Sequence, residues 1–272
     1  MKLATVRVNE QTQAVVIDGE DAVEVGAPDV GALLSDAAWR HRAAGARGPR
    51  YDVTTLDYAP LVPRPSKIIC VGLNYRAHIL EVGQPLPEYP TLFAKFTPAL
   101  IGAFDDIQLP DVVEQMDWEA ELGVVVGAHA YRVDEAGAEA AIAGYTVCND
   151  VSARDWQLRT PQWLQGKTFA GTTPVGPWLV TPDEAGSAHE ITCEVGGKLM
   201  QKATTADLVF GPAHLVSYIS TILPLEPGDL IMTGTPGGVG HALSPQRWLA
   251  DGEQVVTRIS GVGECRNVCR RG

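Results

Sequence analysis

Glycine and proline interrupt this chain along its whole length, and they constrain its fold more than any other feature. The 272 residues include 28 glycines and 19 prolines, spread through the sequence rather than gathered in one segment. Both residues disfavour long uninterrupted helices and favour turns. We therefore expect an α+β, β-rich fold of many short strands joined by turns and functional loops, and not a helical bundle.

Residues 1–60 are expected to form a small N-terminal unit. Its expected elements are strands at Lys2–Val8 and Gln13–Ile17, a turn at 17–20, a helix around Val30–Trp39 and a surface loop at Arg40–Pro49. Pro60, Pro63 and Pro65 then punctuate the chain and indicate a boundary. The main, catalytic unit is expected to span residues 67–272.

Short apolar or β-branched runs dominate the main unit. The expected strands are Ile68–Gly72, Glu121–Gly127, Tyr145–Cys148 and Leu230–Thr233. Helical spacing of apolar residues predicts two helices, at Asp134–Ala143 and Ala206–Ile222. The main unit should therefore contain buried strands with few helices.

The formal net charge of −12 excludes a strongly basic surface of the kind that binds nucleic acid or an anionic membrane. An anionic substrate would then need a local source of positive charge at its site. A bound divalent cation is the simplest such source.

Five cysteines occur mostly within apolar runs, which is typical of small buried thiols in a reducing compartment. Cys265 and Cys269 are close in the chain, but no second pair or histidine cluster accompanies them, which disfavours zinc. The N-terminus lacks the apolar core of a signal peptide, and no apolar run reaches the ~18 residues of a membrane span. We expect a cytoplasmic protein.

Two acidic segments are candidates for metal binding. Glu119 and Glu121 are two residues apart at the start of an expected strand, so their side chains share one face. Asp150 follows another expected strand and is a candidate third oxygen ligand. Three carboxylates suit Mg²⁺ or Mn²⁺, and Ca²⁺ less well. The alternatives are solvated acids on an exposed strand edge, and an aspartate that caps a turn.

His78 and Glu81 are three residues apart after the strand that ends at Gly72, so one helical turn would place them on the same face. A carboxylate beside an imidazole makes a general base that can activate water. The alternative is an incidental pair on a surface helix. Val82–Pro90 contain Gly83 and three prolines, a pattern that suits a lid.

Two further segments can bind an anion. Lys167 lies in a stretch of modest charge and is a candidate partner for an oxyanion. Gly228–Gly240 is a strand that runs into a glycine-rich turn, where backbone N–H groups can approach a carboxylate. This turn lacks the lysine of a nucleotide-binding loop.

Taken together and in this order, these segments resemble the fumarylacetoacetate hydrolase family. The matching pieces are Lys67–Asn74 with Tyr75 and His78, Glu119–Leu122, Asn149–Asp155, Lys167–Phe169, and Gly228–Gly240. The resemblance covers residues 67 to about 268. One departure is that many members continue after the lysine motif as Phe-Asp-Thr-Phe, whereas this chain has Phe169-Ala170-Gly171 and no aspartate.

The resemblance implies a mixed β-sandwich roll and a homodimer. It also implies a divalent metal, usually Mg²⁺ or Mn²⁺, held by Glu119, Glu121 and Asp150, and a His78–Glu81 dyad on a lid that orders when substrate binds. Gln157 and Lys167 match family positions that contact substrate. Thr235 matches a position that helps to hold the substrate carboxylate.

The resemblance further implies an enzyme acting on a small anionic 2-oxo acid. Our leading hypothesis is hydrolytic C–C cleavage of an acylpyruvate such as fumarylpyruvate, with water activated by His78 and the oxyanion stabilised by Lys167. Decarboxylation of oxaloacetate and isomerisation of a 2-hydroxy-diene dioate are rivals, and fold and family do not choose among them. A catalytically silent binding protein is a rival of another class, against which the intact set of acids, dyad and lysine argues.

Overall fold

The computed structural model describes residues 1–81, 83 and 85–272, and Glu81 by its backbone alone. Among these residues, twelve strands form one large sheet and five form a smaller one. The strands of the larger sheet are β1 (Lys2–Val8), β2 (Gln11–Asp18), β3 (Asp21–Glu24), β4 (Arg50–Asp52), β5 (Asp57–Tyr58), β6 (Ile68–Gly72), β7 (Thr91–Lys95), β8 (Leu100–Ile101), β11 (Ala120–Val126), β12 (Ile142–Asn149), β14 (Thr173–Val180) and β17 (Leu230–Met232). Their order is β4-β3-β2-β1-β14-β12-β11-β17-β6-β7, with β5 on β1 and β8 on β14.

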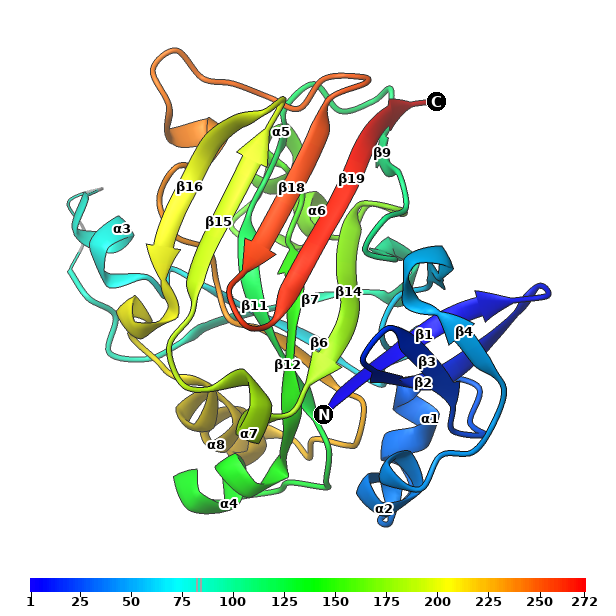
Figure 1. Ribbon diagram of the computed structural model, residues 1–272. Helices are drawn as coiled ribbons and strands as arrows, with labels where there is room; N and C mark the ends of the chain where they lie inside the picture. Colours follow the sequence, from blue (N-terminus) through cyan, green and yellow to red (C-terminus); the bar gives the residue numbers. More distant parts are fainter. Residues whose placement is uncertain (82, 84) are drawn as a thin grey trace.

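The smaller sheet lies in front of the centre of the larger one (Figure 1). It consists of β9 (Ile107–Leu109), β15 (Glu190–Val195), β16 (Lys198–Thr204), β18 (Gln254–Ile259) and β19 (Gly263–Arg271), in the order β16-β15-β18-β19-β9. Two short strands, β10 (Met116–Asp117) and β13 (Ser152–Ala153), pair separately. Buried side chains from both sheets, including Leu122, Ile191 and Val255, share one apolar cluster. The two sheets therefore pack as a sandwich.

The four strands expected in the main unit are confirmed as β6, with the expected bounds, and as β11, β12 and β17, whose ends differ by up to a few residues from those expected. Every residue of β11 is buried. A strand covered on both faces is rich in β-branched and other apolar residues, and the run Leu122–Val126 has this character.

The expected N-terminal hairpin is confirmed as β1 and β2, which pair from Lys2↔Ile17 to Val8↔Gln11. Two short helices follow, α1 (Val30–Leu34) and α2 (Trp39–Ala44). The expected loop at Arg40–Pro49 is wrong over its first residues, because Trp39 and Ala43 are buried and Arg42 donates hydrogen bonds to the carbonyls of residues 25 and 26. β1 also pairs with β14 of the main unit through Lys2↔Val180, so the two predicted units share one sheet. The domain boundary near residue 60 stays a prediction.

Two helices cover the other face of the larger sheet, α4 (Glu135–Ala141) and α8 (Pro212–Ile222). The predicted helix at Asp134–Ala143 is confirmed as α4, with Asp134 as its N-cap. α8 begins six residues later than predicted, because Pro212 occupies the first turn and Asn74 binds the backbone N–H of Phe210 just before it.

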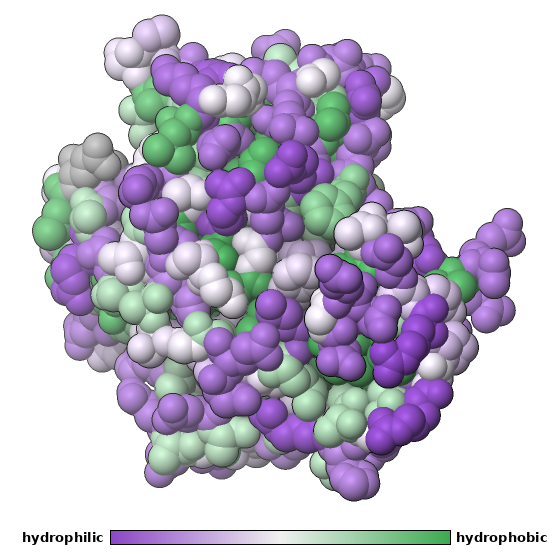
Figure 2. Space-filling model, in the orientation of Figure 1, coloured by the Kyte–Doolittle hydropathy of each residue, from purple (hydrophilic) through white to green (hydrophobic). Residues whose placement is uncertain are grey.

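The remaining short helical segments are α3 (Arg76–Glu81), α5 (Arg154–Gln157), α6 (Leu164–Lys167), α7 (Pro182–Ala185), and the 3₁₀ turns η1 (Val53–Thr55), η2 (Thr97–Ala99), η3 (Thr205–Asp207) and η4 (Gly240–Ala242). Within the described residues, none of the helices combines the length and apolar character needed to cross a membrane. The face seen in Figure 2 is largely hydrophilic, with small apolar areas between polar side chains, as the net charge of −12 leads one to expect.

Candidate active site

The ends of four neighbouring strands meet at one edge of the larger sheet. β11 runs antiparallel to both β12 and β17, so its first residues lie beside the last residues of those strands. β6 runs parallel to β17 and ends at the same edge. Polar residues that directly precede β11, or follow β12 and β17, are therefore brought together although they are far apart in the chain.

Glu119, Glu121 and Asp150 come from these strand ends. Each offers a carboxylate oxygen, and the three oxygens lie within 4.8 Å of one another. The residues are only 7%, 1% and 0% exposed, which rules out the alternative of solvated acids on an open edge. Asp150 is bound by two lysines rather than capping a turn. The structure thus gathers the three predicted ligands in one buried cluster.

Of these three acids, Glu121 is the hardest to ionise. Its burial raises its pKa well above the usual range, and the negative charges of Asp150 and Glu119 raise it further. The backbone N–H of Gly234 opposes this effect by donating a hydrogen bond of 2.8 Å to Oε2 of Glu121. The cluster therefore needs more positive charge for all three acids to ionise together.

Two buried lysines supply part of that charge. Nζ of Lys167 lies 2.7 Å from Glu119 and 2.9 Å from Asp150, and Nζ of Lys95, at the end of β7, lies 2.6 Å from Asp150. Burial works against the ionisation of Asp150, but the two lysines outweigh it and hold the pKa of this carboxyl below its usual value. Lys167 thus contacts two of the proposed metal ligands directly.

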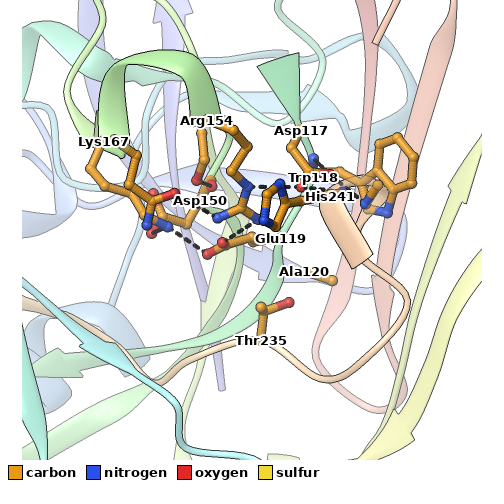
Figure 3. Close-up of polar contacts among 12 residues, drawn as sticks. Asp117, Trp118, Glu119, Ala120, Asp150, Arg154, Lys167, Thr235 and His241 are labelled. Carbon is orange, nitrogen blue, oxygen red and sulfur yellow. Dashed lines mark hydrogen bonds and ion pairs between the residues drawn. The ribbon is translucent and has the colours of Figure 1, made fainter. Parts of the chain in front are cut away.

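Arg154, on α5, forms a second network beside the first. Its guanidinium lies 2.7 Å from Glu119 and 2.8 Å from Asp117 (Figure 3). It also donates a 2.8 Å hydrogen bond to Oε1 of Gln157. Burial acts against this cation, but Glu119 and Asp117 raise the pKa of Arg154 above its ordinary value. Gln157, three residues along the same short helix, is thereby fixed in position.

A cleft of about 240 Å³ opens above these networks. Its polar lining residues are His78, Glu119, Arg154, Gln157, Lys167, Thr235 and His241. Its apolar wall includes Trp163, which packs edge-on against Phe93 and leaves no room for a side chain at Gly72. The cleft is smaller than the ~300 Å³ at which pockets for drug-sized ligands begin, so it suits a small metabolite.

Thr235 follows β17 and reaches the cleft from the glycine-rich turn. Nε2 of Gln201 donates a 2.8 Å hydrogen bond to its hydroxyl oxygen and a 2.9 Å bond to the carbonyl of Pro236. Oε1 of Gln201 in turn accepts from the N–H of Ala120, at the start of β11. Because the Thr235 oxygen already accepts one hydrogen bond, its own hydrogen remains available for a ligand.

Of the predicted dyad, His78 lines the cleft from α3, which confirms the expected helical turn. The side chain of Glu81 lies outside the described residues, and so do Val82 and Gln84 of the predicted lid. The dyad and the lid therefore stay predictions.

The residues present fit a divalent cation by the chemistry of their donors. Three converging carboxylates are hard oxygen ligands of the kind that Mg²⁺ and Mn²⁺ prefer. When the four buried acids of the two networks are all ionised, they face three buried cations, which leaves a net charge of −1. A dication would make this net charge positive, as an anionic substrate requires.

Four residues of the site have no role in the sequence-based prediction: Lys95, Asp117, Arg154 and His241. Arg154 and Gln157 are three apart just after Asp150, which is the one sequence signal that could have indicated their pairing. Asp117 and His241 are 124 residues apart, and no local pattern joins them.

The chain is similar in sequence and in fold to known proteins. The family model described as fumarylacetoacetate (FAA) hydrolase C-terminal matches residues 67–270. Over 219 residues the chain is 44% identical to a Bos taurus protein named oxaloacetate tautomerase FAHD2B, mitochondrial, covering 79% of this chain and 69% of that protein. A crystal structure of 5-carboxymethyl-2-hydroxymuconate delta-isomerase from Mycobacterium smegmatis matches with 32% identity, a TM-score of 0.84 and coverage of 100% of this chain and 99% of that one. Fumarylacetoacetate hydrolase from Exiguobacterium antarcticum matches with 28% identity, a TM-score of 0.90 and full coverage of both chains.

Proposed function

The chain belongs to the fumarylacetoacetate hydrolase family and has its strand-rich fold, and from this premise we propose that it isomerises the keto and enol forms of a small 2-oxo acid such as oxaloacetate. The observation that carries the proposal is the buried trio of Glu119, Glu121 and Asp150 below a small cleft that His78 lines. Relatives named a tautomerase and an isomerase support proton transfer without cleavage of a C–C bond.

A divalent cation, Mg²⁺ or Mn²⁺, held by Glu119, Glu121 and Asp150 would polarise the 2-oxo group and stabilise the negative charge of the enolate. The chain's own residues prepare this site. Lys95 and Lys167 keep Asp150 ionised, and the N–H of Gly234 orients Glu121. The trio is therefore pre-arranged around one point.

His78 is the candidate base for the proton at C3. It lines the cleft together with Glu119 of the trio, and histidine is the side chain that most often acts as a general acid or base. Glu81 is its proposed orienting partner. The hydroxyl of Thr235 would donate to the substrate carboxylate, while Gln157, fixed by Arg154, would bind a second oxygen.

Hydrolytic C–C cleavage of an acylpyruvate is the second candidate. It is favoured by the match over both full chains to a structure described as fumarylacetoacetate hydrolase. In this case His78 would deprotonate water, and Lys167 would stabilise the oxyanion that forms on the distal carbonyl.

An assay with two substrates separates these candidates. The purified protein with Mg²⁺ is offered the enol form of oxaloacetate and, separately, fumarylpyruvate, and both enol absorbance and released pyruvate are followed. With oxaloacetate, we expect the protein to accelerate the loss of the enol form well beyond the rate with Mg²⁺ alone. With fumarylpyruvate, we expect no release of pyruvate. Release of pyruvate from fumarylpyruvate with no effect on the enol would instead favour the hydrolase.

We further propose that the enzyme is a cytoplasmic homodimer. Exposed apolar side chains are available for contact with a second copy, among them Phe96, Leu164 and Leu158, the last of which also lines the cleft. Five free, buried cysteines suit a reducing compartment. Light scattering coupled to gel filtration should give twice the mass of the 29.0 kDa chain, and a monomer at micromolar concentration would contradict the dimer.

A further inference from the structure

One polar side chain of the cleft has no role in the reaction proposed above. His241 lies on η4, in the segment that follows the glycine-rich turn, and its side chain is exposed at the cleft. In Figure 3 His241 and Arg154 project toward the same part of the cleft. The position of His241 is thus at the solvent side of the site, while the carboxylate trio is at its buried side.

The backbone of His241 is tied to the buried network. The carboxylate of Asp117 accepts hydrogen bonds from the N–H of Gly240 at 2.6 Å and from the N–H of His241 at 3.0 Å. The same carboxylate binds Nε of Arg154 at 2.8 Å and is fully buried. Arg154 in turn contacts Glu119, one of the proposed metal ligands. Asp117 therefore fixes the η4 turn relative to the trio.

The imidazole itself is also oriented. Nε2 of Gln246 lies 3.0 Å from the carbonyl oxygen of His241, so this atom must be the amide nitrogen that donates. The same nitrogen lies 3.3 Å from Nδ1 of His241, which must then accept. The ring proton is consequently on Nε2, and the ring also packs against Trp248. In this arrangement His241 presents an oriented N–H donor.

The charges of the site give this donor a function. With their four acids ionised, the buried residues of the two networks carry a net charge of −1, and a divalent cation would bring the total to +1. A monocarboxylic 2-oxo acid would neutralise this charge, whereas a dicarboxylic acid brings a second anionic group that has no buried cation left to balance it. That second group is best placed near water with a hydrogen-bond donor beside it, which is the position of His241.

We propose that His241 is a specificity-determining residue that recognises the distal carboxylate of a dicarboxylic 2-oxo acid. The inference rests on the proposed function, because it assumes that the 2-oxo end of the substrate lies over Glu119, Glu121 and Asp150. It assigns the enzyme to 2-oxo acids with two carboxylates rather than one.

The test compares the binding of two 2-oxo acids of equal carbon number. 2-Oxoglutarate and 2-oxopentanoate differ only in that a distal carboxylate replaces a methyl group, and oxalate lacks a distal group altogether. Affinities of the Mg²⁺-loaded protein are measured by calorimetry. We expect the wild type to prefer 2-oxoglutarate, and His241→Ala to bind 2-oxoglutarate roughly tenfold to a hundredfold more weakly, as for a lost hydrogen bond to a charged group.

The same substitution should leave the affinities for oxalate and 2-oxopentanoate unchanged. His241→Gln keeps an N–H donor and should restore part of the affinity for 2-oxoglutarate. His129→Ala is the matched control, since this exposed histidine pairs with Glu226 away from the cleft, and it should change no affinity. Equal loss for all three ligands in His241→Ala, or no loss for 2-oxoglutarate, would overturn the inference. Failure of the wild type to bind oxalate would overturn the proposed function, and this inference with it.

Discussion

At the scale of single residues, His78 is the side chain on which the reaction depends most. If His78 is the general base, the His78→Ala substitution should lower kcat by roughly two to four orders of magnitude, the usual contribution of such a base. Metal affinity should change little, because His78 is not among the ligands. His129→Ala is the control, because it removes an exposed histidine outside the cleft.

One variant assayed on two reactions shows what His78 does. Decarboxylation of oxaloacetate, if the enzyme performs it, should survive His78→Ala better than isomerisation, since it requires no proton to be abstracted from C3. Equal loss in both reactions would mean that His78 acts in substrate binding or lid closure. Negligible loss in isomerisation would remove His78 from the mechanism.

The cysteines give a second prediction at this scale. All five are free and buried, and burial raises the pKa of Cys70 and Cys148 well above the ordinary value. The reactive form is the thiolate, so at pH 8 these thiols stay protonated as well as shielded. An aromatic disulfide reagent should label no cysteine in the native protein and all five after denaturation. Rapid labelling of any thiol in the folded protein would contradict this burial.

The sequence predicted the members of the metal site better than their surroundings. Glu119 directly precedes β11, Glu121 lies near its start, and Asp150 directly follows the strand paired with β11, so local patterns and one strand pairing bring them together. The network of Asp117, Arg154 and His241 depends on contacts between distant segments. Such contacts are decided by packing of the two sheets and carry no local signature.

At the scale of elements, the turn after β17 is the most constrained segment of the site. Gly234 has a φ of +97°, and a Cβ there would lie 2.9 Å from the carbonyl oxygen of Val71. Its N–H also orients Glu121. Gly234→Ala should therefore destabilise the fold by about 1–3 kcal/mol and weaken Mg²⁺ binding.

Gly19→Ala is the matched control for this substitution. Gly19 also has a positive φ, of 65°, but a methyl group at this position would meet nothing within 4 Å. The Gly19→Ala variant should lose only about 1 kcal/mol of unfolding free energy, because alanine disfavours a positive φ. Its affinity for Mg²⁺ should be unchanged. Urea unfolding and metal titration measure both effects. Equal results for the two variants would show that the turn does not hold Glu121.

Prediction of helices and strands from the sequence succeeded where a local apolar pattern decides the structure. It failed where hydrogen bonds from distant segments compete with that pattern. β1 and β6 begin and end where expected, because their apolar runs are bounded by turns. The apolar spacing from Ala206 predicted a longer helix than α8, but Asn74 accepts hydrogen bonds from the N–H groups of Val209 and Phe210 and holds this segment outside the helix. A hydrogen bond from 136 residues away is invisible to periodicity.

At the scale of the whole molecule, two packed sheets bury a group of charges that no single element could hold. The carboxylates of Glu119, Glu121 and Asp150 are nearly inaccessible to water. The free-energy cost of burying these negative charges is offset by the cations of Lys95, Lys167 and Arg154, which come from three other elements. Full ionisation of Glu121 requires further positive charge, which a bound dication would supply. Binding of Mg²⁺ or Mn²⁺ to the native state alone should also stabilise it.

The most direct test of this account is turnover of a 2-oxo acid in EDTA, followed by addition of Mg²⁺ or Mn²⁺. Wild-type activity should be abolished by the chelator and restored by either metal. Glu121→Ala should stay inactive at every metal concentration, whereas Glu226→Ala, which removes an exposed acid outside the cleft, should behave as the wild type does. Full turnover of the wild type in excess EDTA would contradict the account.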